Sequence, residues 1–250
     1  MSNVLDSLEI LPIQTQNQNN NVEYNPVLPD INNGSILMLV APPKSGKTVN
    51  ISSMLLRKSF YKDKFDTIYI FSTTIANGDN SSRFLLEYDR VKIYNKYSDE
   101  ALQNILNFQA SFDKEHMPRI SIIFDDFLSF PNIKKTSLMF TLASMYRHYG
   151  VKFLVYSTQI FRGVPPIVRQ SLDYLIMYSN GNQKEVMKIY DEVGSRFGSF
   201  RQFIKLLNEA TKDKYNFLYL DLYNRPALAY KNFTQLIYEA PQTFEYLQPN

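Results

Sequence analysis

The sequence predicts an α/β fold, with a mainly parallel central sheet flanked by helices. Short apolar runs, each the length of a buried strand, recur along the chain, and segments with helical spacing separate them. Runs that are apolar throughout indicate strands covered on both faces, and their alternation with helices is typical of a parallel sheet. Strands are expected at residues 36–40, 67–71, 91–94, 119–124, 151–156 and 173–178.

The remaining elements complete one domain. Helices are expected at residues 47–60, 100–108 and 134–149. Residues 31–250 are predicted to form a single domain, with a C-terminal helical and strand extension after about residue 180; its elements are two helices, the second at 200–208, and a strand near 215–220. Residues 1–30 are predicted to be an N-terminal arm, partly flexible, because the Gln/Asn tract at 14–21 has little apolar surface to bury.

The composition of the sequence excludes several classes of protein. With 250 residues, of which 44% are hydrophobic, the chain can bury a sizeable core. No apolar run approaches the roughly 20 residues needed to span a bilayer, and the N-terminus lacks the pattern of a signal peptide, so we expect an intracellular protein without a membrane partner. The absence of Cys excludes disulfides and thiolate metal sites. A net charge of +3 permits a polyanionic partner without requiring one.

The eight residues after the first expected strand have the pattern of a phosphate-binding loop. The pattern Gly-x-x-x-x-Gly-Lys-Ser/Thr, in which Ala is often accepted first, is met here with Ala at its start. Such a loop turns backbone N–H groups toward phosphates, its lysine reaches the β- and γ-phosphates, and its last hydroxyl binds Mg²⁺. The residues expected to bind ATP are Ala41, Pro42, Pro43, Lys44, Ser45, Gly46, Lys47 and Thr48.

The individual roles in this loop follow from the residue types. Pro42 and Pro43 have no N–H, so the donors must come from Lys44 onward. Lys47 is expected to be catalytic and exposed in the nucleotide site, and Thr48 to be a metal ligand. Because the motif lies between a strand and a helix, a functional loop is favoured over a chance match. The sequence therefore predicts the P-loop NTPase fold, with ATP and Mg²⁺ as its ligands.

Polar residues at two other strand ends extend the predicted site. Asp125 and Asp126 follow an apolar strand, which is the Walker B arrangement; the alternative is a strand-terminal turn. We expect Asp125 to hold Mg²⁺, through water, and Asp126 to polarise the attacking water from a place where many ATPases carry Glu. Gln159 follows the next strand, at the edge where ligands bind, and is expected to contact the γ-phosphate or the water; the alternative is a polar cap on a loop.

The strand at 67–71 is expected to lie between the P-loop strand and the acidic strand. An inserted strand of this kind marks the additional-strand catalytic type of P-loop ATPase. That branch includes ring-shaped motors whose arginines act across subunits.

Together, these motifs resemble a known family. They are residues 41–48, Ile122-Ile123-Phe124-Asp125-Asp126, Arg147-His148, Ser157-Thr158-Gln159 and Pro165-Pro166-Ile167-Val168-Arg169. The combination is similar to the genome-packaging ATPases of nucleocytoplasmic large DNA viruses and virophages, of the FtsK/HerA superfamily, over roughly residues 35–180.

The resemblance implies a DNA-packaging motor. Its partners would be double-stranded DNA and the proteins of a viral capsid or portal vertex, and it would form a homo-oligomeric ring, a pentamer or hexamer, that drives viral DNA into a preformed capsid. It would be located in the host cytoplasm, in a viral factory, or in the virion. The arginine that acts on a neighbouring subunit's nucleotide would be Arg147 first and Arg169 second; the alternative for each is a surface or phosphate-contacting arginine.

Two other functions stay open from the residues alone. One is another DNA pump or a helicase, which would share the same site. The other is a nucleotide-dependent switch or a kinase. The lack of an evident Arg-rich lid and the presence of Gln159 favour an ATPase over a small-molecule kinase.

Overall fold

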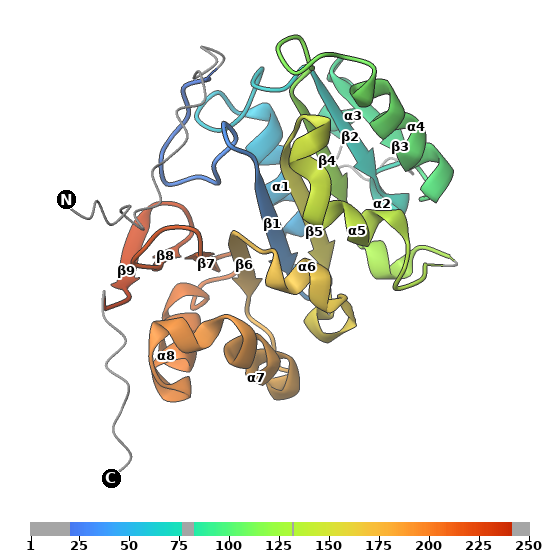
Figure 1. Cartoon of the computed structure of the whole chain (residues 1–250). Coiled ribbons are helices and arrows are strands. Elements are labelled where there is room, and N and C mark those ends of the chain that lie inside the picture. Colours follow the sequence, from blue (N-terminus) through green and yellow to red (C-terminus); the bar gives the residue numbers. More distant parts are fainter. Residues whose placement is uncertain (1–20, 77–82, 132, 242–250) are drawn as a thin grey trace, which may run out of the picture.

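A mixed nine-stranded sheet forms the centre of the computed structural model, which describes residues 21–76, 83–131 and 133–241 (Figure 1). Its strands are β1 Ser35–Val40, β2 Thr67–Phe71, β3 Val91–Tyr94, β4 Ile120–Phe124, β5 Val151–Thr158, β6 Tyr174–Tyr178, β7 Phe217–Asp221, β8 Leu228–Lys231 and β9 Gln235–Glu239. The spatial order is β3-β2-β4-β5-β1-β6-β7-β8-β9. The first six strands in this order pair in parallel, and β7, β8 and β9 continue the sheet antiparallel.

Alternate side chains of the central strands pack into two separate cores. On β1, Met38 and Val40 point into one core, whereas Leu37 and Leu39 point into the other. All six residues of β1 are buried. A strand that is covered on both faces is mostly apolar, which is why residues 36–40 of β1 form a continuous apolar run rather than an alternating one.

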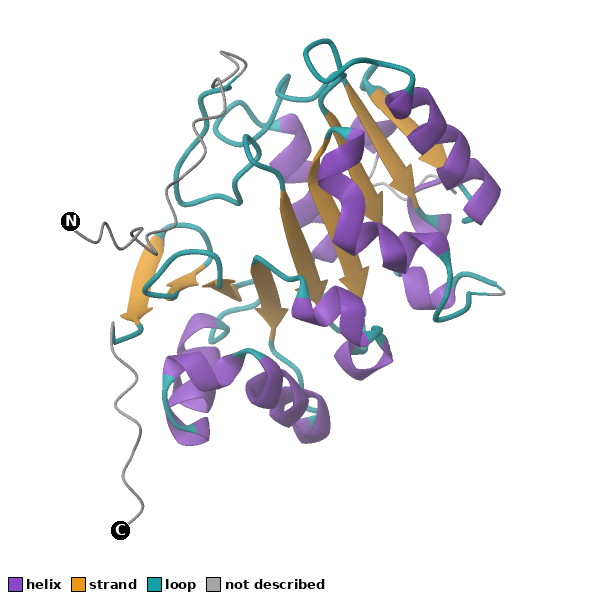
Figure 2. Cartoon of the chain, in the orientation of Figure 1, coloured by secondary structure: helices purple, strands orange, loops and turns teal. Residues whose placement is uncertain are grey.

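Helices cover both faces of the sheet (Figure 2). The helices are α1 Lys47–Leu56, α2 Thr73–Ala76, α3 Arg83–Leu86, α4 Asp99–Ala110, α5 Leu138–Met145, α6 Pro166–Gln170, α7 Gln183–Glu192 and α8 Phe200–Ala210. Buried side chains of α1, α2 and α3 pack into the core that contains Leu37, and those of α4 to α8 pack into the core that contains Met38. The sheet is therefore the middle layer of three.

The described part of the predicted N-terminal arm packs against the domain. Leu28 of this arm is 4% exposed, and it belongs to the core on the α1 side together with Ile31, the first residue of the predicted domain. The hydroxyl of Tyr61, which follows α1, donates a hydrogen bond of 2.7 Å to the carbonyl of Pro29. The predicted Gln/Asn tract, up to residue 20, lies outside the described residues.

The sheet confirms the predicted α/β class and differs from the prediction in two respects. The six expected parallel strands form, but the C-terminal extension adds an antiparallel edge in which β8 and β9 were not expected. The expectation that residues 67–71 lie between the P-loop strand and the acidic strand is wrong. β5 lies between β1 and β4, and β2 lies on the far side of β4. Position along the chain does not fix position in a parallel sheet, because each crossover can place the next strand on either side.

Candidate nucleotide site

The predicted site residues converge at one edge of the sheet. The loop at 41–48 follows β1, the two aspartates follow β4, and Gln159 follows β5. β4, β5 and β1 are neighbours and run in parallel, so their carboxyl ends meet. The crevice beyond the carboxyl ends of parallel strands is where α/β proteins bind ligands.

The backbone of the loop at 41–48 is shaped to receive an anion. Lys44 (φ 61°) and Gly46 (φ 96°) both adopt the left-handed conformation. Gly46 is the N-cap of α1, and no side chain in the described part of the chain caps its first turn. The first N–H groups of a helix have no partner inside the helix, and with the left-handed residues they form an anion-binding concavity. The curled part of the loop begins at Lys44, after the two prolines.

Lys47 forms an ion pair with Asp126. Its Nζ donates to Oδ1 of Asp126, which lies at the N-cap of the turn after β4 with a left-handed backbone (φ 50°). The two side chains are 9% and 26% exposed. The expectation that Lys47 is exposed is therefore wrong: the residue is 8% exposed because the pairing draws its ammonium across the end of the sheet. Gln159 adjoins the same carboxylate, with Nε2 3.4 and 3.5 Å from its two oxygens.

Asp125 is enclosed behind this pair and is held by two hydroxyl groups. Ser157 Oγ donates to Oδ1 at 2.7 Å, and Ser72 Oγ donates to Oδ2 at 3.0 Å. Asp125 is 1% exposed. Burial raises the pKa of its carboxyl above the usual range, and the Ser157 hydroxyl and the Lys47 ammonium offset part of that rise. A buried carboxylate that forms no ion pair within the described part of the chain is suited to bind a cation.

Two of these contacts could not be assigned from the sequence. Ser72 ends β2, and its hydroxyl reaches Asp125 because β2 lies next to β4. A single Ser after an apolar strand gives no signal until the order of the strands is known. Ser157 was part of a recognised motif, but its role became clear only from its contact with Asp125.

The residues at this edge suit a nucleotide with Mg²⁺. Mg²⁺ takes oxygen ligands and is often held by one or two carboxylates together with substrate phosphates. Among the described residues, no group of three or more His, Cys, Asp and Glu side chains could hold a metal. Asp125 can still accept from a water, because each carboxylate oxygen has two lone pairs and here uses one. In the loop itself, the Ser45 hydroxyl is buried and has no hydrogen-bond partner among the described residues, which leaves a donor for a ligand.

Arg147 lies far from this cluster within one chain. It belongs to the 3-10 turn Tyr146–Tyr149, which precedes β5, and its guanidinium donates to the carbonyl of Gly34 at 3.4 Å. Gly34 precedes β1, so Arg147 lies at the amino ends of these strands. Six residues of β1 separate that edge from the loop at 41–48, a distance of roughly 20 Å. A role of Arg147 at the nucleotide of another subunit stays a prediction.

Arg169 is held by contacts inside the chain. Its Nε lies 2.7 Å from a carboxylate oxygen of Glu192, and the side chain is 11% exposed. One Nη donates to the carbonyl of Val164 at 2.9 Å, and the guanidinium lies over the ring of Phe161. These contacts connect α6 with α7, a structural role; action across a subunit boundary stays a prediction for this residue also.

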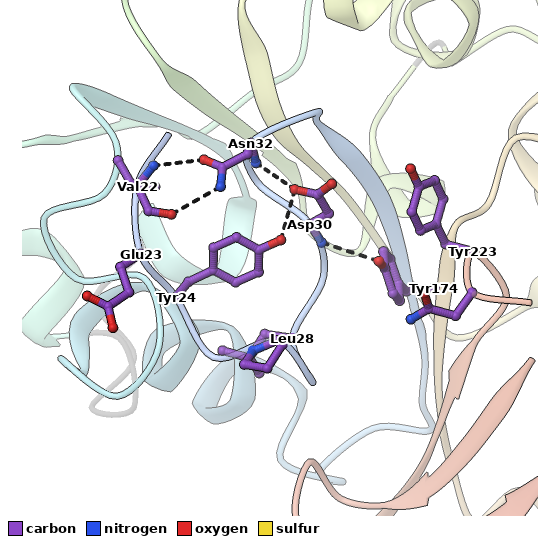
Figure 3. Close-up of a pocket in the computed structure, with 10 residues that line it drawn as sticks. Val22, Glu23, Tyr24, Leu28, Asp30, Asn32, Tyr174 and Tyr223 are labelled. Carbon is purple, nitrogen blue, oxygen red and sulfur yellow. Dashed lines mark hydrogen bonds between the residues drawn. The ribbon is translucent and has the colours of Figure 1, made fainter. Parts of the chain in front are cut away.

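The amino-end edge of the sheet carries a cavity of about 400 Å³. Figure 3 shows the side chains that line it, among them Tyr24, Asp30, Tyr174 and Tyr223. The oxygens of Asp30 already accept hydrogen bonds from the Tyr24 hydroxyl, from Asn33 and from backbone N–H groups. Hydrogen bonding keeps the pKa of Asp30 below its usual value even though partial burial acts to raise it. This cavity is larger than a second one, described below, near the loop at 41–48, but its Asp30 carboxylate already has hydrogen-bond partners within the chain.

Comparisons with known proteins agree with the fold. No family model matches the chain. The uncharacterized protein 088R of Invertebrate iridescent virus 3 is 24% identical over 189 residues, which are 75% of this chain and 69% of that protein. The genome packaging NTPase B204 of Sulfolobus turreted icosahedral virus 2, in complex with AMPPCP, superimposes with a TM-score of 0.54 and 20% identity over 80% of this chain and 98% of B204. The conjugation coupling protein TcpA of pCW3, in complex with ATPγS, superimposes with a TM-score of 0.53 and 12% sequence identity over 76% of this chain and 58% of TcpA.

The chain thus shares its fold with proteins that were solved in complex with AMPPCP and ATPγS. The chain shares its mixed α/β architecture with the viral packaging protein B204 in particular, nearly all of which is covered by the superposition. Among the described residues, none of the helices has the length and apolar character needed to cross a membrane.

Proposed function

We propose that the chain is a P-loop ATPase of the additional-strand type, which binds ATP with Mg²⁺ and hydrolyses it. One observation carries this proposal: Lys47, Asp126 and Gln159, which come from the ends of three neighbouring strands, meet in one cluster. Hydrolysis of a phosphate anhydride needs a cation to bind the phosphates, a carboxylate to accept a proton from the attacking water, and a polar group to orient that water. The strand β5 between β1 and β4 supports the additional-strand type.

Each group in the cluster has a distinct task. The N–H groups of the loop at 44–48 and the Lys47 ammonium stabilise negative charge on the phosphates. The Asp126 carboxylate, once it leaves Lys47, accepts a proton from the attacking water, which the Gln159 amide orients. The Thr48 hydroxyl and Asp125 hold Mg²⁺, with Ser72 and Ser157 fixing the Asp125 carboxylate. When bound, Mg²⁺ neutralises charge on the phosphate oxygens.

We further propose that hydrolysis drives double-stranded viral DNA into a preformed capsid. The similarity of fold to a genome packaging NTPase and the similarity of sequence to an iridescent virus protein support this proposal. The active form is then a homo-oligomeric ring that contacts capsid or portal vertex proteins in a viral factory or a virion. The fold shared with a conjugation coupling protein supports a second candidate, a DNA pump that serves another process.

The test measures the rate of ATP hydrolysis with and without double-stranded DNA, together with the mass of the particle in solution. The wild type is expected to hydrolyse ATP faster with double-stranded DNA and to form particles several times the mass of one chain. Lys47→Ala is expected to lose turnover while it melts within a few degrees of the wild type, since the Asp126 carboxylate that it leaves unpaired is 26% exposed and can be hydrated. Lys58→Ala, at an exposed lysine just after α1, is the matched control and should keep full activity.

The outcomes separate the two levels of the proposal. Normal turnover by Lys47→Ala would remove the assignment of the loop as an ATP site. A wild type that is fully active as a monomer and indifferent to DNA would leave the ATPase and remove the motor. Stimulation by DNA should also weaken as salt is added, because phosphate contacts release counterions.

A further inference from the structure

A second cavity, of about 260 Å³, opens directly beside the loop at 41–48. Lys44 and Ser45 form one wall, and Tyr178 and Ser179, at the end of β6, form another. The rest is lined by residues 211–216, which connect α8 with β7. Drug-sized ligands use pockets of about 300–1,000 Å³, so this cavity has room for a fragment of a nucleotide rather than a whole one.

The cavity and the proposed chemical groups lie on opposite sides of β1. Asp126 and Gln159 come from β4 and β5, on one side of β1 in the sheet, whereas β6 and β7 lie on the other. A triphosphate whose terminal phosphate faces Asp126 and whose chain follows the loop at 41–48 therefore carries its nucleoside toward the β6 and β7 side. That side is where the cavity lies.

Tyr215 is the large aromatic side chain at the mouth of this cavity. Its backbone has a left-handed φ of 70°, which costs a residue with a side chain free energy, and the residue is 57% exposed. A Cβ placed on Gly46 would lie only 3.3 Å from Cδ1 of Tyr215, so the ring adjoins the backbone of the loop at 41–48. A strained and exposed aromatic residue gains little from packing in the chain itself, and such residues cluster at ligand sites.

The surroundings of Tyr215 hold it at this place. The Lys214 ammonium lies 4.8 Å from the centroid of its ring. Asp213 accepts from Asn216 at 3.1 Å and pairs with Lys231 of β8 at 3.2 Å, which fixes the segment to the sheet. On the facing wall, Asn50 of α1 donates to the Tyr178 hydroxyl at 3.0 Å in a buried bond. Both walls are thus built by contacts within the chain.

We propose that Tyr215 is the platform on which the base of the bound nucleotide stacks, with the base and ribose held in this cavity. The proposal rests on the proposed ATPase function and adds the residues that hold the nucleoside. Aromatic side chains bind any base through its π-face, so Tyr215 contributes affinity for a nucleoside triphosphate rather than selection of one base. Its loss should weaken binding of ATP but not of a ligand that has phosphates alone.

The test compares ATP with inorganic tripolyphosphate as probes of the whole chain, each with Mg²⁺. Tyr215→Ala is expected to lower the affinity for ATP by about 5- to 150-fold, the range for loss of one base–aromatic stack, and to leave that for tripolyphosphate within about twofold of the wild type. Tyr215→Phe keeps the ring and should bind ATP like the wild type. Tyr223→Ala is the matched control, because Tyr223 is 48% exposed and lines the cavity at the other edge of the sheet.

A fluorescence signal gives an independent measurement. The chain contains no Trp, so Tyr215→Trp introduces a single one. ATP should change its emission at concentrations that saturate binding, and tripolyphosphate should change it far less. This result does not depend on how well the Ala variant folds.

The outcomes distinguish the base site from the ATPase. Lys47→Ala should lose affinity for both probes, and if it binds both like the wild type, the ATPase assignment fails. If Lys47→Ala loses both while Tyr215→Ala binds ATP as tightly as the wild type, or more tightly, the loop holds phosphates but Tyr215 does not hold the base. Equal weakening of both probes by Tyr215→Ala would assign Tyr215 to the support of the loop and would overturn the proposal as well.

Discussion

Asp125 offers a test in which stability and ligand binding respond in opposite directions. The residue is 1% exposed, and its carboxylate accepts hydrogen bonds from two hydroxyl groups but forms no ion pair with any described residue. Burial raises its pKa above the ordinary value of 3.8. The folded state is therefore most stable, with respect to this group, at pH values below 3.8, where the carboxyl is neutral in both states. This contribution to the free energy of unfolding is lost as the pH rises through the raised pKa of the folded state. At neutral pH the ionised carboxylate lowers the stability of the protein without ligand.

Asp125→Asn is expected to make the protein without nucleotide more stable at pH 7 to 8. The amide has the same shape, and the Ser72 and Ser157 hydroxyls can each donate or accept, so both contacts can be kept. Removing the buried charge is expected to contribute on the order of 1 kcal/mol, which for a chain of this length corresponds to a rise in Tm of about 2–4 °C. The advantage should vanish well below pH 3.8, where the wild-type carboxyl is neutral in both the folded and the unfolded state.

With Mg²⁺ and ATP bound, the wild type should become more stable than Asp125→Asn. A ligand present at 100 times its Kd stabilises the wild type by about 2.7 kcal/mol, or about 5–10 °C in Tm. The Asn variant should gain little, because it lacks the carboxylate that holds the metal. Thermal unfolding followed by circular dichroism, with and without MgATP and at several pH values, measures both effects.

Asp221→Asn is the control for the ligand effect. Asp221 is 2% exposed, burial also raises its pKa, and it lies at the end of β7 away from the proposed site. MgATP should raise the Tm of this variant by as much as it raises that of the wild type, even if the substitution itself changes the stability of the protein without ligand. An Asp125→Asn protein that is less stable than the wild type at neutral pH would refute the argument from burial. One that gains as much from MgATP as the wild type would refute the role of Asp125 as a metal ligand.

The remaining predictions concern catalysis. Asp126→Asn should keep its affinity for ATP but stall hydrolysis, because an amide cannot take the proton of the attacking water; equilibrium binding and phosphate release measure this, and a wild-type rate would contradict it. Arg147→Ala should keep ATP affinity and lose turnover by about 10³-fold or more if the arginine acts in trans. Mixing it with Lys47→Ala subunits should then restore part of the activity, since each supplies what the other lacks, whereas absence of rescue would exclude that role.

The parallel part of the sheet was predictable because burial on both faces leaves a simple trace in the sequence. In β1 the five residues after Ser35 form one apolar run, and β4 is apolar at every position except Ser121. β8 and β9 leave no such trace. They are short, they lie at the antiparallel edge, and none of the five residues of β9 is buried. A strand of this kind is defined by pairing with its neighbour rather than by its own composition.

Within the site, the sequence placed the groups that follow parallel strands and missed those that depend on strand order. The meeting of Lys47, Asp126 and Gln159 follows from a shared edge. The contact of Ser72 with Asp125 requires that β2 adjoin β4, which no motif records. The position of Arg147 could have been inferred, since a residue that precedes a parallel strand lies at the edge opposite to the one the strand's carboxyl end reaches.

Because Asp126 forms an ion pair with Lys47, its carboxylate would compete with the phosphates of a nucleotide for the Lys47 ammonium. Under the proposed mechanism, a phosphate group uses the Lys47 ammonium by displacing Asp126, so nucleotide binding would also release the carboxylate that is proposed to accept the proton. A free phosphate ion meets a lysine that is already neutralised, and it brings none of the other contacts of a nucleotide. When the product departs, Asp126 returns to Lys47 and opposes its rebinding. Under the proposed mechanism, the carboxylate that accepts the proton would therefore also resist product inhibition.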